Sequence, residues 1–167
     1  MRLPLTALLV SAALCACSST VEEEEVSGPS VSELIRSTRY EQALRLSGEL
    51  VEEAPSSASF SQHRMATVAW LMNQGRNLTF TDQDHEALLT FEQALLLEPK
   101  SDIVLMWVGK TRAKIATLLF QEGTEFHAKE DYTLALERYT QALEMNPAHE
   151  GARRGMALAR RQSEYRV

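Results

Sequence analysis

Cysteine is nearly absent from this chain: its only two, Cys15 and Cys17, lie within the first twenty residues. The rest of the chain therefore has no thiol for a disulfide framework, a thiolate metal site or a cysteine nucleophile. Seven glycines and five prolines in 167 residues are too few for a collagen-like or low-complexity protein. A net charge of -6 argues against a nucleic-acid-binding protein, which normally carries a basic face.

Motifs for catalysis are also missing. The chain has neither a glycine-rich phosphate loop nor a Gly-x-Ser-x-Gly nucleophile turn. Its four histidines, His63, His85, His127 and His149, are scattered and do not pair at the spacing of helical metal ligands. We therefore expect no catalytic, metal or cofactor site, and we expect that the protein is not an enzyme.

The composition that remains is that of an ordinary folded protein. Hydrophobic residues make up 44% of the chain and charged residues 24%. About 150 residues follow the N-terminal apolar segment, which is enough for one domain with its own hydrophobic core.

The N-terminal segment, residues 1–16, has the pattern of a secretory signal peptide. Arg2 supplies a positive charge, and an apolar stretch follows from Leu3 to Leu14. This stretch is shorter than the roughly 20 residues that a membrane-spanning helix needs.

The residues that follow, Leu14-Cys15-Ala16-Cys17, resemble the lipobox of bacterial lipoproteins. The resemblance implies that Cys17 is acylated and becomes the anchored N-terminus. Cys15 fits less well, because Leu14 would then occupy a position that prefers a small residue. Ser18, in place of an aspartate, implies the outer membrane, so the predicted location is the cell envelope, facing the periplasm. The alternative is an ordinary signal peptide in which Cys17 is incidental.

Residues 17–30 are predicted to be a disordered acidic tether. They contain four consecutive glutamates, Glu22 to Glu25, followed by Gly28-Pro29, and their apolar residues show no periodicity. The alternative is that the glutamates form a docking site for a basic partner.

One spacing occurs three times in the rest of the chain. An Ala-Leu pair is followed, twelve residues after the alanine, by a proline: Ala43 and Pro55, Ala87 and Pro99, Ala135 and Pro147. Between these residues, apolar or small residues recur every three or four positions, as on one face of a helix. The pattern predicts three helices, each ended by its proline.

These segments resemble the second helix of the tetratricopeptide repeat. The third copy carries the family's residues at Leu119, Gly123, Phe126, Tyr132, Ala135, Tyr139, Ala142 and Pro147. The second keeps Leu71, Gly75, Ala87, Phe91, Ala94 and Pro99, and the first is degenerate, with Ser47 in place of the aromatic residue. The resemblance implies an all-α fold over residues 31–167: a helical solenoid of about three helix pairs plus a C-terminal capping helix.

The chain departs from the family in repeat length. Its prolines are 44 and 48 residues apart, whereas the family unit has about 34 residues. The surplus falls within Ser57–Thr67 and Asp102–Ile115, where helical spacing continues. We therefore predict extended first helices in repeats two and three, the latter starting near Ser101 as N-cap. The alternative is an additional short helix with a kink at Gly109.

The C-terminal residues 149–162 resemble a capping helix, with Ala152, Met156, Ala157 and Ala159 on one side and arginines elsewhere. Residues 150–167 carry a charge of +3, and residues 17–149 carry -10. The arginines could be a solvated surface, or they could contact an acidic segment or anionic headgroups.

In the family, residues of the first helices line an inner groove. The resemblance implies that the groove of this chain is lined by Thr117, Phe120, Thr124, His127, Arg154 and Arg161. Trp70 and Trp107 are expected to pack in the core, and Trp107 is the better candidate for exposure.

The predicted function is that of a membrane-anchored scaffold lipoprotein that binds an envelope protein or peptide. The processes implied by analogy are pilus or secretion assembly and outer-membrane or cell-wall machinery. No nucleic-acid partner is expected. The alternative is an accessory lipoprotein that binds a small molecule or substrate in a pocket around Trp107 and Phe120.

Overall fold

The computed structural model describes residues 28–164, and all regular secondary structure in this range is α-helical. The helices are α1 (Val31–Arg36), α2 (Tyr40–Glu53), α3 (Ser57–Phe80), α4 (Asp84–Leu97), α5 (Asp102–Ala128), α6 (Tyr132–Met145) and α7 (Glu150–Glu164). The predicted signal peptide, Cys17 and the Glu22–Glu25 run lie outside the described residues.

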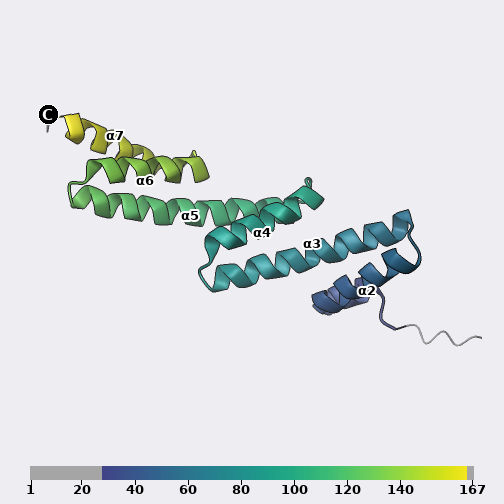
Figure 1. The fold of residues 1–167 in the computed structure, drawn as a ribbon. Coiled ribbons are helices and arrows are strands. Elements are labelled where there is room, and N and C mark those ends of the chain that lie inside the picture. The colour runs from purple at the N-terminus through teal and green to yellow at the C-terminus, as the bar shows by residue number, and fades with distance from the viewer. Residues whose placement is uncertain (1–27, 165–167) are drawn as a thin grey trace, which may run out of the picture.

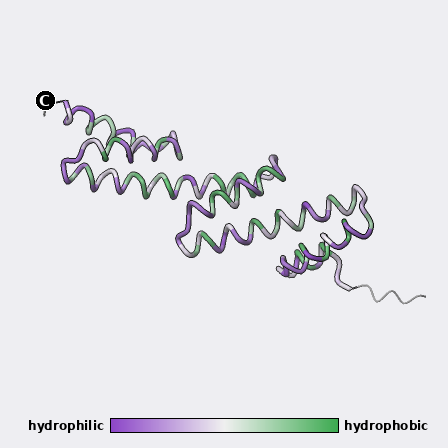
Figure 2. The backbone as a smooth tube through the Cα atoms, viewed as in Figure 1, coloured by the Kyte–Doolittle hydropathy of each residue, from purple (hydrophilic) through white to green (hydrophobic). Residues whose placement is uncertain are grey.

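Consecutive helices pack against one another along an elongated molecule, whose chain runs from one end to the other (Figure 1). The all-α prediction is confirmed. The three helices expected before Pro55, Pro99 and Pro147 are α2, α4 and α6. Figure 2 shows hydrophobic and hydrophilic residues alternating along each helix, as expected for helices with one buried face.

The two long helices are continuous, as predicted. The helix α3 has 24 residues and α5 has 27, and α5 passes through Gly109 without a break. The alternative of a separate short helix kinked at Gly109 is therefore wrong. Ser101 is the N-cap of α5, but its side chain makes no capping hydrogen bond.

Each long helix has different partners along its two halves (Figure 1). The first half of α3 packs on α2, where Ser47 Oγ lies 3.1 Å from His63 Nδ1, and its second half packs on α4. The first half of α5 packs on α4, and its second half packs on α6 and α7 (Figure 1). By contrast, α3 and α5 are not packed side by side. The extension of each long helix therefore supplies the surface on which the preceding short helix packs.

Two groups of helices are each packed around a buried aromatic ring. The helices α3, α4 and α5 surround Phe91, and the helices α5, α6 and α7 surround Tyr139. Phe91 of α4 is fully buried, and its ring faces Gly75 of α3 and stacks on Trp107 of α5, with ring centroids 5.4 Å apart. Tyr139 of α6 is 2% exposed and lies between Gly123 of α5 and Gly155 of α7. These glycine and aromatic residues follow one another at constant intervals of sixteen residues: Gly75, Phe91, Trp107, Gly123, Tyr139 and Gly155.

The first helix pair uses a polar side chain at the corresponding place. Ser47 stands where Phe91 and Tyr139 stand in the later copies, as the sequence indicated, and it is completely buried. The smaller core cluster at this end of the molecule consists of Val31, Leu34, Ala43 and Ala66. The main core extends from α3 to α7.

The turns that follow α1, α3 and α5 have the same conformation. Thr38, Asp82 and Glu130 all have positive φ angles, of 60°, 57° and 61°. The amide that follows each of them donates to a carbonyl five residues earlier, as in Arg39 N to Leu34 O at 2.9 Å. These turns recur at intervals of 44 and 48 residues, the spacing of the prolines. The sequence repeat is therefore also a repeat of backbone structure.

Lys114 links the turn between α3 and α4 to the middle of α5. Its Nζ lies 2.9 Å from Asp82 Oδ1 and 3.0 Å from Asp84 Oδ2. Hydrogen bonds to the carboxylates of Asp82 and Asp84 raise the pKa of Lys114. Because Asp84 is only 3% exposed, this ammonium group balances an almost buried charge.

The helix α7 covers the C-terminal end, as predicted, and it buries Ala152 and Ala159. Ala157, expected on the same side, is exposed. Five residues after Ala152 the helix has turned about 140° beyond a full turn, so Ala157 points away from α6.

Gly75 has no room for a side chain beside the ring of Phe91. A Cβ at this position would lie 2.5 Å from Cε1 of Phe91, whereas a Cβ at Gly109 meets nothing within 4 Å. Gly75→Ala should lower the free energy of unfolding by about 1–3 kcal/mol, because the enclosed ring cannot move aside. Gly109→Ala should raise it by up to about 1 kcal/mol through helix propensity. Denaturant unfolding of both variants checks this, and a stabilising Gly75→Ala would contradict it.

Candidate functional site

A surface hollow of about 440 Å³ lies between α5 and α7, over Tyr139 of α6. We call it the α5–α7 hollow. Four of the six predicted groove residues line it: Phe120, Thr124, His127 and Arg154. Its other lining residues are Ala128, Tyr139, Gly151, Gly155 and Leu158. The hollow thus combines aromatic and aliphatic walls with one arginine.

Phe120 forms the aromatic wall of the hollow. Its ring centroid lies 5.9 Å from that of Tyr139 and 5.1 Å from that of His149. A Cβ at Gly151 would lie 3.1 Å from Cζ of Phe120, so the lack of a side chain at Gly151 lets α7 approach this ring closely. The ring is held by α6 and α7 on one side and is partly exposed on the other.

His127 joins the ends of the two helices that form the hollow. Its Nε2 donates a hydrogen bond to Oε1 of Gln162, near the end of α7. Its ring also packs edge-on against Tyr132, with centroids 5.4 Å apart. His127 therefore lines the predicted groove and also positions α7.

The two predicted threonines differ in position. Thr124 lines the hollow and Thr117 does not, although both are exposed and both hydroxyls donate to a carbonyl four residues earlier, at 2.9 Å. Arg161 also lies outside the lining residues. On α7 the lining ends at Leu158, and the hydrogen bond from His127 to Gln162 closes the hollow at this end. The helical register alone therefore overestimated the length of the hollow.

The residues that the sequence did not assign to the site are Ala128, Tyr139, Gly151, Gly155 and Leu158. A signal for Gly155 was present, because it follows Tyr139 by the sixteen residues that separate Tyr139 from Gly123. No comparable periodicity identifies Leu158, whose role depends on how α7 packs.

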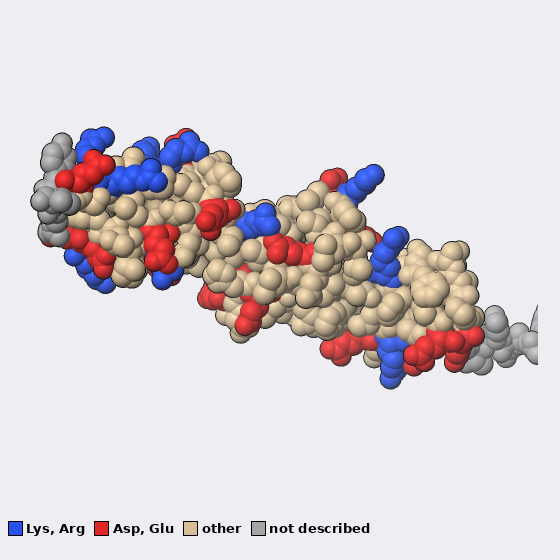
Figure 3. Space-filling view, turned by 45° about the horizontal axis from the view of Figure 1, so that its top comes forward, with Lys and Arg blue, Asp and Glu red and all other residues tan. Residues whose placement is uncertain are grey.

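Arginines are concentrated on α7. Blue side chains gather along the C-terminal end of the face drawn in Figure 3. Arg154, Arg160 and Arg161 are exposed, as are Glu150 and Glu164 at the two ends of the helix. Arg153 is also exposed, but its guanidinium donates to the carbonyl of Pro147 at 2.8 Å and is held at the turn between α6 and α7. Arg154 is thus the arginine placed at the hollow.

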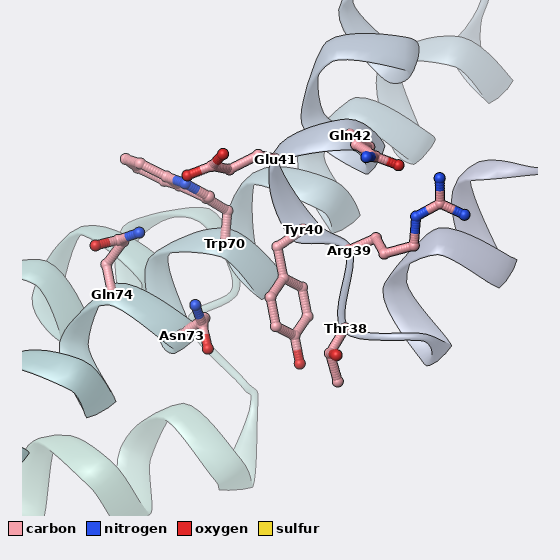
Figure 4. A pocket seen from close by; sticks show the side chains of 8 residues that line it. All are labelled: Thr38, Arg39, Tyr40, Glu41, Gln42, Trp70, Asn73 and Gln74. Carbon is pink, nitrogen blue, oxygen red and sulfur yellow. The ribbon is translucent and has the colours of Figure 1, made fainter.

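The tryptophans occupy places that differ in part from the prediction. Trp107 is half-buried and stacks on Phe91, which confirms that it packs in the core. The expectation that Trp107 is more exposed than Trp70 is not confirmed, because both are half-buried. Trp70 packs against the core and also lines a second hollow, of about 270 Å³, beside the turn between α1 and α2 (Figure 4). This hollow is lined mostly by polar side chains, among them Asn73 and Gln74.

Trp107 and Phe120 do not form one pocket. They are thirteen residues apart on α5, which corresponds to about 20 Å along a helix. Trp107 is absent from the lining of the α5–α7 hollow. The predicted small-molecule pocket around both residues is therefore wrong in that form.

No family model, curated protein or solved structure matches this chain. Between residues 28 and 164, no group of three or more histidine, aspartate or glutamate side chains is arranged to hold a metal ion. In the same range no helix has the length and hydropathy needed to cross a membrane.

The hydrogen bond between His127 and Gln162 gives a prediction. Gln162→Ala removes it without removing a lining residue of the hollow. Loss of one such bond costs about 1 kcal/mol, so amide exchange in the last two turns of α7 should accelerate about fivefold. Hydrogen-exchange mass spectrometry of the variant checks this, with α3 as the internal control. Unchanged exchange in α7 would show that the bond does not hold this helix.

Proposed function

We propose that this chain is a lipid-anchored tetratricopeptide-like scaffold protein of the bacterial envelope, which binds a protein or peptide segment in the α5–α7 hollow. The recurring turns at Thr38, Asp82 and Glu130 and the paired glycine and aromatic positions support a solenoid of three helix pairs with α7 as its cap. Stacked helix pairs of this kind offer extended surfaces for partner proteins.

The observation that carries the proposal is the meeting of Phe120, Thr124, His127 and Arg154 in one hollow. Aromatic side chains beside an arginine are the residue types enriched where partner proteins bind most tightly. The walls fit an apolar side chain, and Arg154 at the rim fits a carboxylate. The partner is therefore a segment that carries an apolar side chain next to an acidic residue.

The anchor and the location rest on the N-terminal sequence. Acylation of Cys17 would attach the chain to the membrane by several acyl chains, which is more stable than attachment by one. The acidic residues 17–30 would separate the helical domain from the anionic lipid surface. Pilus or secretion assembly and outer-membrane or cell-wall machinery are the processes proposed, by analogy with lipoproteins of this architecture.

A matched pair of arginine variants tests the binding site. Arg154→Glu reverses a charge in the α5–α7 hollow, and Arg153→Glu makes the same change at the neighbouring residue outside it. Crosslinking pulldown from envelope fractions should recover about tenfold less partner with Arg154→Glu, equivalent to about 1.4 kcal/mol. Arg153→Glu should bind like the wild type. Equal recovery with both variants would remove the hollow as the binding site.

A second pair tests the anchor. Cys17→Ser should move the protein from the membrane fraction to the soluble fraction, because it removes the acylated atom. Cys15→Ser should leave the protein with the membranes. Detergent-free fractionation and mass spectrometry of the N-terminal peptide provide the measurement. Membrane retention of Cys17→Ser, or its loss in Cys15→Ser alone, would contradict the assignment.

A further inference from the structure

The outward face of α4 is apolar although it is exposed to solvent. Leu89 and Leu96 lie two turns apart on this face, with exposed fractions of 61% and 82%. Gln93 lies between them and is also exposed. Further exposed apolar side chains follow along the chain, at Leu97, Ile103, Leu105 and Met106.

The fold does not require leucines at these positions, because the corresponding helices carry polar residues there. In α4 the three positions are Leu89, Gln93 and Leu96, and by the 44- and 48-residue spacing they correspond to Arg45, Glu49 and Glu52 of α2 and to Glu137, Gln141 and Glu144 of α6. All three helices pack between their neighbours in the same order. The leucines of α4 are therefore explained by something that this face contacts.

A hollow of about 690 Å³ runs beside this face. It is lined by Leu89, Leu95, Leu96 and Pro99, by Gln93, and by Glu92 and Arg112, which form an ion pair. Leu105 precedes Arg112 by two helical turns and so lies on the same side of α5. The hollow thus has apolar walls and one ion pair.

Charges at the two ends of the α4 face have opposite signs. The exposed Glu86 lies at the N-terminal end, where Glu144 of α6 and His85 line an adjoining hollow. The exposed Lys100 lies just beyond the C-terminal end, and it shares a further hollow with Arg64 of α3 and with Glu98, so positive charges outnumber negative ones there. When two such helices pair antiparallel, the acidic end of each meets the basic end of the other.

We propose that a second copy of this chain docks on the outward face of α4, forming a two-fold symmetric dimer with its axis near Gln93. Leu89 of each copy then packs against Leu96 of the second copy, and Glu86 lies opposite Lys100 of the second copy. A two-fold interface requires a surface that is complementary to itself, and this combination of a leucine stripe and opposed end charges meets that requirement. The face is separate from the α5–α7 hollow, so the dimer does not depend on the proposed function.

Replacing both leucines tests the proposal. Leu89→Glu/Leu96→Glu gives α4 the glutamates that α6 carries at Glu137 and Glu144, so the helix should tolerate them. The full-length chain, purified in detergent, should sediment as a dimer, and the variant should sediment as a monomer with an unchanged circular dichroism spectrum. A monomeric wild type, or a variant that stays dimeric, would overturn the proposal. The proposal would also be overturned if the wild type were monomeric and used these leucines to bind a different envelope protein.

Two further comparisons test the geometry. Gln93→Cys should form a disulfide-linked dimer under mild oxidation, whereas Gln141→Cys, the same change at the matching position of α6, should form no more of it than the wild type. Glu86→Lys should reduce the dimer fraction at least fivefold, and Glu86→Lys/Lys100→Glu should restore it. Equal crosslinking at both glutamine positions, or failure of the double reversal to restore the dimer, would contradict the antiparallel arrangement.

Discussion

The ring of Phe91 is enclosed between α3 and α5, and the ring of Tyr139 is enclosed between α5 and α7. Each ring meets a helix that has no side chain at the point of contact, so the helices approach closely while the aromatic residue fills the space between them. This packing sets the order of the helices and brings α7 alongside α5. The α5–α7 hollow exists because α7 is held there.

Much of the fold could be predicted from the sequence because it depends on local signals. The Ala-to-Pro spacing identified α2, α4 and α6, and uninterrupted helical periodicity identified the long α5. The packing of the long helices was harder to infer. A helical pattern shows which face is buried, but it does not show which neighbour buries it, so the separation of α3 from α5 could not be predicted.

The same distinction applies to the candidate site. Register along one helix brought Phe120, Thr124 and His127 together correctly, since they share a face of α5. The register of α5 also placed Thr117 in the groove, and the register of α7 placed Arg161 there. Neither residue lines the hollow, because its ends are determined by contacts between helices. The tryptophans illustrate this too: Trp107 is held against Phe91 from a different helix, and Trp70 borders the turn at Thr38, which belongs to a different helix pair.

The repeated scaffold carries different surfaces on its successive units. The outward face is charged on α2 and α6 and apolar on α4, while the arginines are concentrated on α7. Because corresponding positions serve the same packing, the fold itself does not require these differences, and our proposals assign them to contacts with other molecules. The proposed partner site lies at the C-terminal end of the chain, and the proposed dimer contact lies at its middle.

A double-mutant cycle between Gly123 and Tyr139 tests most directly whether an aromatic ring packed against a glycine holds this structure together. Gly123→Ala, Tyr139→Leu and the double variant would be compared by their free energies of unfolding. We expect Gly123→Ala to destabilise the wild type but to be neutral or stabilising beside Leu at position 139, with a coupling energy of about 1 kcal/mol or more. The same destabilisation in both backgrounds would contradict the account.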